Sequence, residues 1–167
     1  MANETVYLAG GCYWGFEDLL SKIPGVIETA VGFSGGHVKN VSYREVSSGT
    51  TGHAETVKVI FNSDILSFTD LLTFFFKMHN PTTLNQQGND IGTQYRSAIF
   101  ATTDEQILLA EELIKKIDSL GVLTKKITTE VNTFNTFFLA EENHQKYLEK
   151  YPDGYSCHFI RDINLSV

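Results

Sequence analysis

Cys12 has the surroundings of a reactive cysteine. It lies in the stretch GGCYWGFE at residues 10–17, after a strand-like run at residues 6–9 and at the start of a helix-like apolar pattern that ends at Ile23. A cysteine in such a strand-to-helix turn is near free backbone N–H groups and the positive end of the helix dipole, and both favour the thiolate. The flanking glycines permit φ > 0 and would leave the sulfur uncovered. The alternative is a small buried hydrophobic residue, but the glycines favour a nucleophile.

Glu55 is a carboxyl group on the apolar face of an expected strand at residues 53–61. The two-residue period of a strand places Glu55 on the same face as Val57, Val59 and Phe61. Burial raises the pKa of a carboxyl group, and one that stays protonated near neutral pH can donate a proton. The alternative is that Glu55 lies at the end of the strand and meets water.

Three chemistries are compatible with a thiolate in this setting. The first is a cysteine nucleophile activated by histidine, as in thiol hydrolases; the local sequence singles out none of the five histidines, which are His37, His53, His79, His144 and His158. The second, a zinc site made of Cys12, Cys157 and two histidines, lacks the spacing that zinc ligands show. The third is redox chemistry, in which the thiolate takes up an oxygen atom and a second cysteine resolves the sulfenic acid. Cys157, in the sequence GYSC, is either that second thiol on a flexible tail or a spare cysteine.

Composition and charge restrict the class of protein. The 167 residues suit one domain over residues 1–167, with residues 150–167 as a C-terminal tail that carries Cys157. A formal net charge of −7 without a basic cluster argues against nucleic acid or an anionic membrane as partner. Neither a signal peptide nor an apolar run near the ~18 residues of a membrane span is visible, so we expect a cytoplasmic protein, by default a monomer. In that reducing compartment a pair of cysteines is more often catalytic than structural.

The elements that must position these residues alternate along the chain. Apolar periodicity, caps and turn residues predict strands at residues 6–9, 26–33, 53–61, 95–101 and 127–131, and helices at 16–23, 67–78, 103–120 and 140–150. Long polar loops are expected at residues 34–52 and 81–92. The first six elements follow the β-α-β-β-α-β order of ferredoxin-like proteins. The sequence therefore predicts an α+β fold, a two-layer sandwich with a ferredoxin-like core and additional C-terminal elements.

Four motifs, in one order and over nearly the whole chain, resemble those of the A-type peptide methionine sulfoxide reductases. They are GCYWG at residues 11–15, which is similar to the family signature Gly-Cys-Phe-Trp-Gly, then GTTGHAE at 49–55, QGNDIGTQYRS at 87–97 and AEENHQ at 140–145. The resemblance implies reduction of the S-epimer of methionine sulfoxide, protein-bound or free, to methionine.

The resemblance also implies the catalytic roles. Cys12 would attack the sulfoxide sulfur, and Glu55 would protonate the departing oxygen. Cys157 is similar to the single recycling cysteine of the shorter members, so the resemblance implies a Cys12–Cys157 disulfide that thioredoxin reduces. No metal or flavin takes part in this scheme, and we expect no cofactor.

Substrate-binding roles follow from the same motifs. By resemblance, the hydroxyl groups of Tyr43 and Tyr95 bind the sulfoxide oxygen, and Asp90 is the loop carboxylate beside the pocket. Tyr13 and Trp14 would hold the substrate methyl group in an apolar niche, as aromatic faces beside a methylsulfinyl group should.

The sequence departs from the family pattern at three points. Tyr13 replaces the commoner Phe, which adds a hydroxyl group that needs a partner, and Asn143 stands where Tyr is usual. The third cysteine of the longer members is absent, which implies resolution in one step. A function of another class, a binding module for oxidised or methionine-rich peptides without turnover, would produce no disulfide.

Overall fold

A curled six-stranded sheet forms the centre of the molecule. The computed structural model describes residues 3–156 and 158–165. The strand order is β7-β6-β1-β3-β2-β8. The strands are β1 (Asn3–Gly10), β2 (Val26–Ser34), β3 (Ala54–Asn62), β6 (Ser97–Ala101), β7 (Glu130–Thr133) and β8 (Phe137–Leu139). Neighbours pair antiparallel except for β6 and β7, which are parallel, so the sheet is mixed.

Three longer helices accompany the sheet: α1 (Tyr13–Ser21), α3 (Phe68–Met78) and α4 (Asp104–Leu120). The side chains of Ser67 and Thr103 accept backbone N–H groups at the starts of α3 and α4, as their sequence positions predict. Gly121 ends α4 with φ 68°, in the left-handed region where glycine is favoured. Among the described residues, no helix is long and apolar enough to cross a membrane.

The two faces of the sheet have different roles. On one face, the paired residues Leu8 and Val57 of β1 and β3 are fully buried in a large core that α1, α3 and α4 complete. The opposite face carries a smaller cluster around Tyr7 and Phe100, which Phe134 and Phe137 cover. The larger core therefore lies on the face that Glu55 and Val57 share, as the strand pattern predicts.

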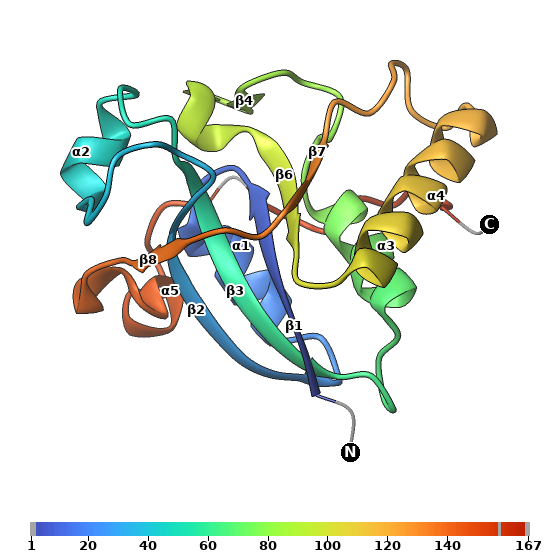
Figure 1. Cartoon of the computed structure of the whole chain (residues 1–167), viewed down its shortest axis with the longest axis horizontal. Coiled ribbons are helices and arrows are strands. Elements are labelled where there is room, and N and C mark those ends of the chain that lie inside the picture. Colours follow the sequence, from blue (N-terminus) through green and yellow to red (C-terminus); the bar gives the residue numbers. More distant parts are fainter. Residues whose placement is uncertain (1–2, 157, 166–167) are drawn as a thin grey trace.

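The sheet is curled because one short segment supplies both of its edges. β7 and β8 are the two edge strands, yet only residues 134–136 separate them in the sequence. In a flat sheet these edges would lie about 24 Å apart, whereas a chain of that length spans at most about 14 Å. Figure 1 shows this segment crossing the sheet. Along the crossing, the Phe134 ring stacks on Tyr7 with centroids 4.0 Å apart, and its N–H donates to the Ala101 carbonyl oxygen.

The structure corrects the expected helix at residues 140–150. The segment forms two short pieces, the 3₁₀ helix η2 (Glu142–His144) and α5 (Tyr147–Lys150). Between them Lys146 has φ 51°, in the left-handed region that breaks a right-handed helix. The Gln145 side chain bonds the N–H and carbonyl groups of Val31, so tertiary contacts to β2 override the helical pattern here.

Other differences lie in the segments expected as loops. The first loop contains α2 (Tyr43–Ser47), which begins with a capping box between Ser42 and Glu45. The second contains a small hairpin of β4 (Gln86–Gln87) and β5 (Asp90–Ile91), followed by the 3₁₀ helix η1 (Thr93–Tyr95). β7 corresponds to the strand that the sequence predicts at residues 127–131. The sequence predicts no strand at β8, because its three residues carry no strand pattern of their own.

Candidate active site

Cys12 is the residue at the N-cap of α1, in the turn predicted between β1 and that helix. Gly11 before it has φ 103°, a conformation that a side chain would strain. The expectation of an uncovered sulfur is wrong, because Cys12 is only 5% exposed. The glycines instead admit other segments: a Cβ at Gly11 would lie 2.8 Å from the Gln87 side chain, and one at Gly15 would collide with Ser156.

Glu55 lies at the start of β3 and points to the turn that carries Cys12. Its Oε1 accepts a hydrogen bond of 3.2 Å from the backbone N–H of Tyr13, the residue after Cys12. Its other oxygen, Oε2, is buried without a hydrogen-bond partner among the described residues. The side chain is 1% exposed, so the alternative of a strand end in water is wrong.

Burial determines the protonation state of this carboxyl group. Burial raises the pKa of Glu55 from its ordinary 4.5 to about 8 and is the largest effect. The hydrogen bond from the Tyr13 N–H lowers the pKa, and the charge of Asp90 raises it further. At neutral pH the folded protein therefore holds a protonated carboxyl group beside the Cys12 turn.

Two tyrosines and Asp90 face the same space. Tyr43 begins α2, Tyr95 ends η1, and Asp90 belongs to β5. Burial raises the pKa of Tyr43 to about 12, and the charges of Glu55, Cys12 and Asp90 add to this effect. Burial also raises the pKa of Tyr95, and electrostatic interactions with Glu55, Tyr43, Asp90 and Cys12 add to this effect. The electrostatic effects among these groups place three segments, at Tyr43, at Glu55 and at residues 90–95, around Cys12. Both phenols stay protonated and can act as hydrogen-bond donors.

An aromatic wall adjoins this space. The Trp14 indole stacks on Tyr147 with centroids 4.0 Å apart and planes 16° apart, and Trp14 Nε1 donates to Nδ1 of His144 at 3.0 Å. The His144 ring in turn stacks on Tyr43 at 4.3 Å. Because Nδ1 accepts, the proton of the neutral imidazole is on Nε2, and burial lowers the pKa of His144. The sequence assigned no role to Tyr147 and none in particular to His144, although His144 belongs to the motif at residues 140–145.

Tyr13 is fully buried in the interior between β2 and α2. Its ring lies 5.8 Å from Phe33 and 6.1 Å from Tyr43. Its hydroxyl group, for which the sequence predicted a need for a partner, has no hydrogen-bond partner among the described residues. Burial raises the pKa of Tyr13, so the phenol is neutral.

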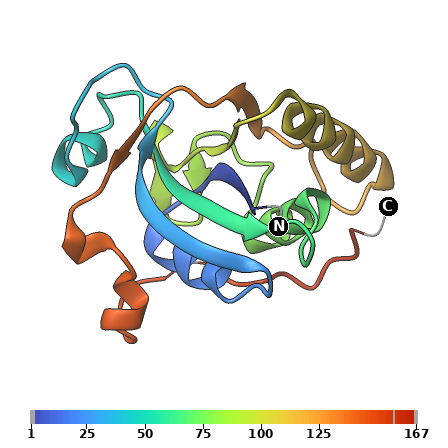
Figure 2. The ribbon, with the colours of Figure 1, turned by 60° about the horizontal axis from the view of Figure 1, so that its bottom comes forward.

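Cys157 lies outside the described residues, but its neighbours in the sequence contact the site. Tyr155 Oη donates to Asp90 Oδ2 at 3.1 Å, and His158 Nε2 donates to the Gly10 carbonyl oxygen at 2.7 Å. Ser156 lies against Gly15. The described part of the tail continues along α1 and past α3 (Figure 2), where the Arg161 N–H donates to the Lys77 carbonyl oxygen. Leu165 ends it in the core, 1% exposed.

Two of the histidines considered as bases for the thiol have other partners. His53 accepts the Gly36 N–H through Nδ1 and bonds a backbone carbonyl group through Nε2. His79 bonds the Phe75 carbonyl group and the Ser97 hydroxyl group, and burial lowers its pKa to about 3. Both imidazole rings therefore make hydrogen bonds to other parts of the fold.

Within the part of the chain that the structure describes, no three His, Cys, Asp or Glu residues lie close enough together to hold a metal ion.

A cysteine at a helix N-terminus beside a protonated carboxyl group is the arrangement of an enzyme that works through a thiol. The chain belongs to the peptide methionine sulfoxide reductase family, whose model matches residues 4–166. The peptide methionine sulfoxide reductase MsrA 1 of Mesorhizobium japonicum is 50% identical over 160 residues, which are 96% of this chain and 91% of that protein.

Solved structures of a yeast relative have the same fold. Reduced Mxr1 from Saccharomyces cerevisiae matches with a TM-score of 0.88 at 37% identity, over 96% of this chain and 93% of that one. Mxr1 in complex with Trx2 matches with a TM-score of 0.63 at 23% identity, over 96% of this chain and 91% of that one. The mixed α/β fold with a curled sheet is therefore that of the family.

Proposed function

We propose that this chain reduces the S-epimer of methionine sulfoxide, in proteins or free, to methionine, with Cys12 as the nucleophile. The observation that carries the proposal is the hydrogen bond from the Tyr13 N–H to Glu55, which holds a protonated carboxyl group next to the Cys12 turn. Family membership and the identity with relatives of that name support it.

In the first step, the Cys12 thiolate attacks the sulfoxide sulfur, and Glu55 gives its proton to the oxygen. The oxygen and proton end on Cys12 as a sulfenic acid, and methionine leaves as the thioether, so the step balances. A sulfoxide oxygen is a poor leaving group without a proton, and general acid assistance is typically worth ~10²–10⁴ in rate. The neutral phenols of Tyr43 and Tyr95 donate hydrogen bonds to the oxygen as charge develops on it.

The aromatic wall binds the substrate methyl group. Trp14 presents its indole between Tyr43 and Tyr147, and Tyr13 supports this wall from the interior. The faces of such rings pack well against a methyl group on sulfur. Asp90 raises the pKa of Glu55 and holds Tyr155 of the tail, so it links the site to the recycling segment.

In the second step, the Cys157 thiol attacks the sulfur of the Cys12 sulfenic acid, a Cys12–Cys157 disulfide forms and water leaves. Contacts of Ser156 and His158 with the Cys12 turn support this pairing. Thioredoxin then reduces the disulfide by thiol exchange; the existence of a complex between Mxr1 and Trx2 supports this partner.

We extend the proposal to the architecture. The order β6-β1-β3-β2 with antiparallel neighbours, and crossovers through α1 and α3, supports a ferredoxin-like core. Residues 1–167 then form one catalytic domain, in which residues 150–167 are the tail with the recycling cysteine. Cytoplasmic location and the monomeric state stay predictions.

Mass spectrometry after one equivalent of methionine sulfoxide, without a reductant, tests the function. We expect methionine as product and a protein that has lost two hydrogens, with a peptide map that joins Cys12 to Cys157. An unchanged mass with retained peptide affinity would indicate a binding module, and an acyl adduct on Cys12 after exposure to an ester would indicate a thiol hydrolase. Either result would overturn the proposal.

A further inference from the structure

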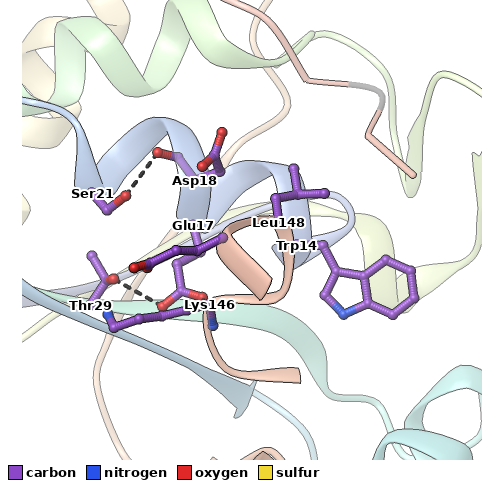
Figure 3. Close-up of a pocket in the computed structure, with 8 residues that line it drawn as sticks. Trp14, Glu17, Asp18, Ser21, Thr29, Lys146 and Leu148 are labelled. Atoms are coloured by element: carbon purple, nitrogen blue, oxygen red, sulfur yellow. Dashed lines mark hydrogen bonds between the residues drawn. The ribbon is translucent and has the colours of Figure 1, made fainter. Parts of the chain in front are cut away.

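Glu17 is a buried carboxylate to which the proposed mechanism gives no role. It lies on α1, one helical turn after Trp14, and is 2% exposed. The described part of the chain contains no ion pair to it. Its two oxygens instead accept neutral donors: Oε2 accepts the Thr29 hydroxyl group at 2.9 Å, and Oε1 accepts the backbone N–H of Lys146 at 2.7 Å. Figure 3 shows Glu17 near Thr29 and Lys146, with Trp14 at the other end of the small cavity that these residues line.

The bond to Lys146 fixes the backbone at a strained position. Lys146 has φ 51° and ψ 42°, a left-handed conformation that residues other than glycine, asparagine and aspartate seldom adopt. Such a conformation persists only where surrounding contacts hold it. The Gln145 side chain holds the chain on one side of Lys146 through Val31, and Glu17 holds the N–H of Lys146 itself.

The residue that follows Lys146 is part of the aromatic wall. Tyr147 begins α5 and stacks on Trp14 at 4.0 Å. Helix α5 has four residues and no side-chain cap, so it is weakly fixed by itself. The ring of Tyr151, its C-cap residue, lies 5.0 Å from the Tyr147 ring but belongs to the same short segment. Helix α1 therefore contacts two successive residues, Lys146 through Glu17 and Tyr147 through Trp14.

We propose that Glu17 is a positioning residue for substrate binding: by accepting the Lys146 N–H, it keeps Tyr147 stacked on Trp14 and so shapes the wall for the substrate methyl group. This inference rests on the proposed function, which makes that wall part of the substrate site. This role requires an acceptor oxygen at the end of the residue 17 side chain and does not require a negative charge there.

The test compares Glu17→Gln, Glu17→Met and Thr29→Val. In Glu17→Gln the amide oxygen accepts the Lys146 N–H while its NH₂ group donates to the Thr29 hydroxyl, so KM stays within about twofold of the unchanged protein. Glu17→Met keeps the volume but loses both acceptors, and we expect KM for methionine sulfoxide to rise about 3- to 10-fold, the worth of one aromatic contact. The first-turnover rate at saturating substrate stays nearly unchanged. Thr29→Val removes the other bond of Glu17 and lowers the melting temperature without raising KM.

The single tryptophan provides a second measurement that does not require activity. Trp14 is the only tryptophan, so its fluorescence reports on the wall directly. We expect acrylamide to quench Trp14 more strongly in Glu17→Met than in Thr29→Val or Glu17→Gln. Tyr147→Leu should raise KM and quenching similarly, and the double variant Glu17→Met, Tyr147→Leu should be no worse than either single one, because both act on the same contact.

These outcomes separate the inference from its alternatives. A lower melting temperature with unchanged KM and quenching in Glu17→Met, an equal rise of KM in Thr29→Val, or additive effects in the double variant would each overturn it. If KM and quenching rise as much in Glu17→Gln as in Glu17→Met, an acceptor oxygen at residue 17 is not sufficient, which contradicts the proposal. If Glu17→Met does not fold, Glu17→Asp, which withdraws the acceptor by one methylene group, carries the same expectation. If the unchanged protein forms no methionine, the proposed function fails, whereas the quenching experiment still tests the link from Glu17 to Tyr147.

Discussion

The Glu55 carboxyl group accepts the backbone N–H of Tyr13 at 3.2 Å, which joins the start of β3 to the first turn of α1. This one bond makes a nucleophile and an acid neighbours, although Tyr13, the residue after Cys12, is 42 positions from Glu55 in the sequence. It also leaves Oε2 as the buried atom from which a proton can go to a substrate.

Replacement of the acid tests the proposed proton transfer. In Glu55→Gln we expect the rate of methionine formation in the first turnover to fall by ~10²–10⁴, because the amide cannot give up a proton, with substrate affinity little changed. Rapid-quench measurement of methionine checks this. Unaltered turnover in this variant would remove Glu55 from the mechanism.

The pH dependence of the rate follows from the same group. Because the protonated form of Glu55 acts and its pKa is about 8, the first-turnover rate should fall as pH rises through about 8. The fall should disappear in Glu55→Gln. A rate that still declines there with the same midpoint would assign the transition to another group.

Stability should depend on pH through the same carboxyl group. The pKa of Glu55 is higher in the folded state, about 8, than its ordinary 4.5, so the folded state binds more protons between these values. The stability that Glu55 contributes is therefore fully present below pH 4.5 and is lost as pH rises through 8. Over this range the free energy of unfolding should fall by up to about 1.4 kcal/mol per pH unit. Denaturant unfolding at several pH values between 5 and 8 measures this. The free energy of unfolding should depend less on pH in Glu55→Gln than in the unchanged protein.

The contact of the tail with α1 can be disturbed at Gly15. A Cβ there would collide with Ser156 and lie 3.2 Å from His158 Nδ1. In Gly15→Ala we expect the first turnover to persist while the disulfide forms more slowly, because the tail is displaced from the Cys12 turn. Trapping of the sulfenic acid with a dimedone reagent measures this delay. The double variant Gly15→Ala, Ser156→Gly should recover part of the rate, and a disulfide that forms as fast in Gly15→Ala as in the unchanged protein would contradict this account.

The two cysteines should fail at different steps. Cys12→Ser should form no methionine, since no nucleophile remains. Cys157→Ser should form one equivalent and then stop as the sulfenic acid when thioredoxin is the only reductant. Assays of methionine per protein distinguish these results, and normal cycling of Cys157→Ser with thioredoxin would make the tail cysteine a bystander.

The sequence by itself determined the local features of the site and most of its frame. The alternation in residues 53–61 placed Glu55 on the core face, and glycine, cap and turn residues located α1, α3 and α4. These signals are local: they depend on the period of side chains along one element and on the backbone preferences of single residues.

The tertiary structure alone decided what those local signals do not contain. The helix expected at residues 140–150 is broken at Lys146, because bonds from Glu17 and Gln145 outweigh the helical pattern. The glycines beside Cys12 receive the tail and Gln87 rather than solvent. Which acid meets which N–H group, and which ring stacks on Trp14, depends on contacts between segments far apart in the sequence, such as Trp14 and His144, which are 130 positions apart. No pattern within one element records such contacts.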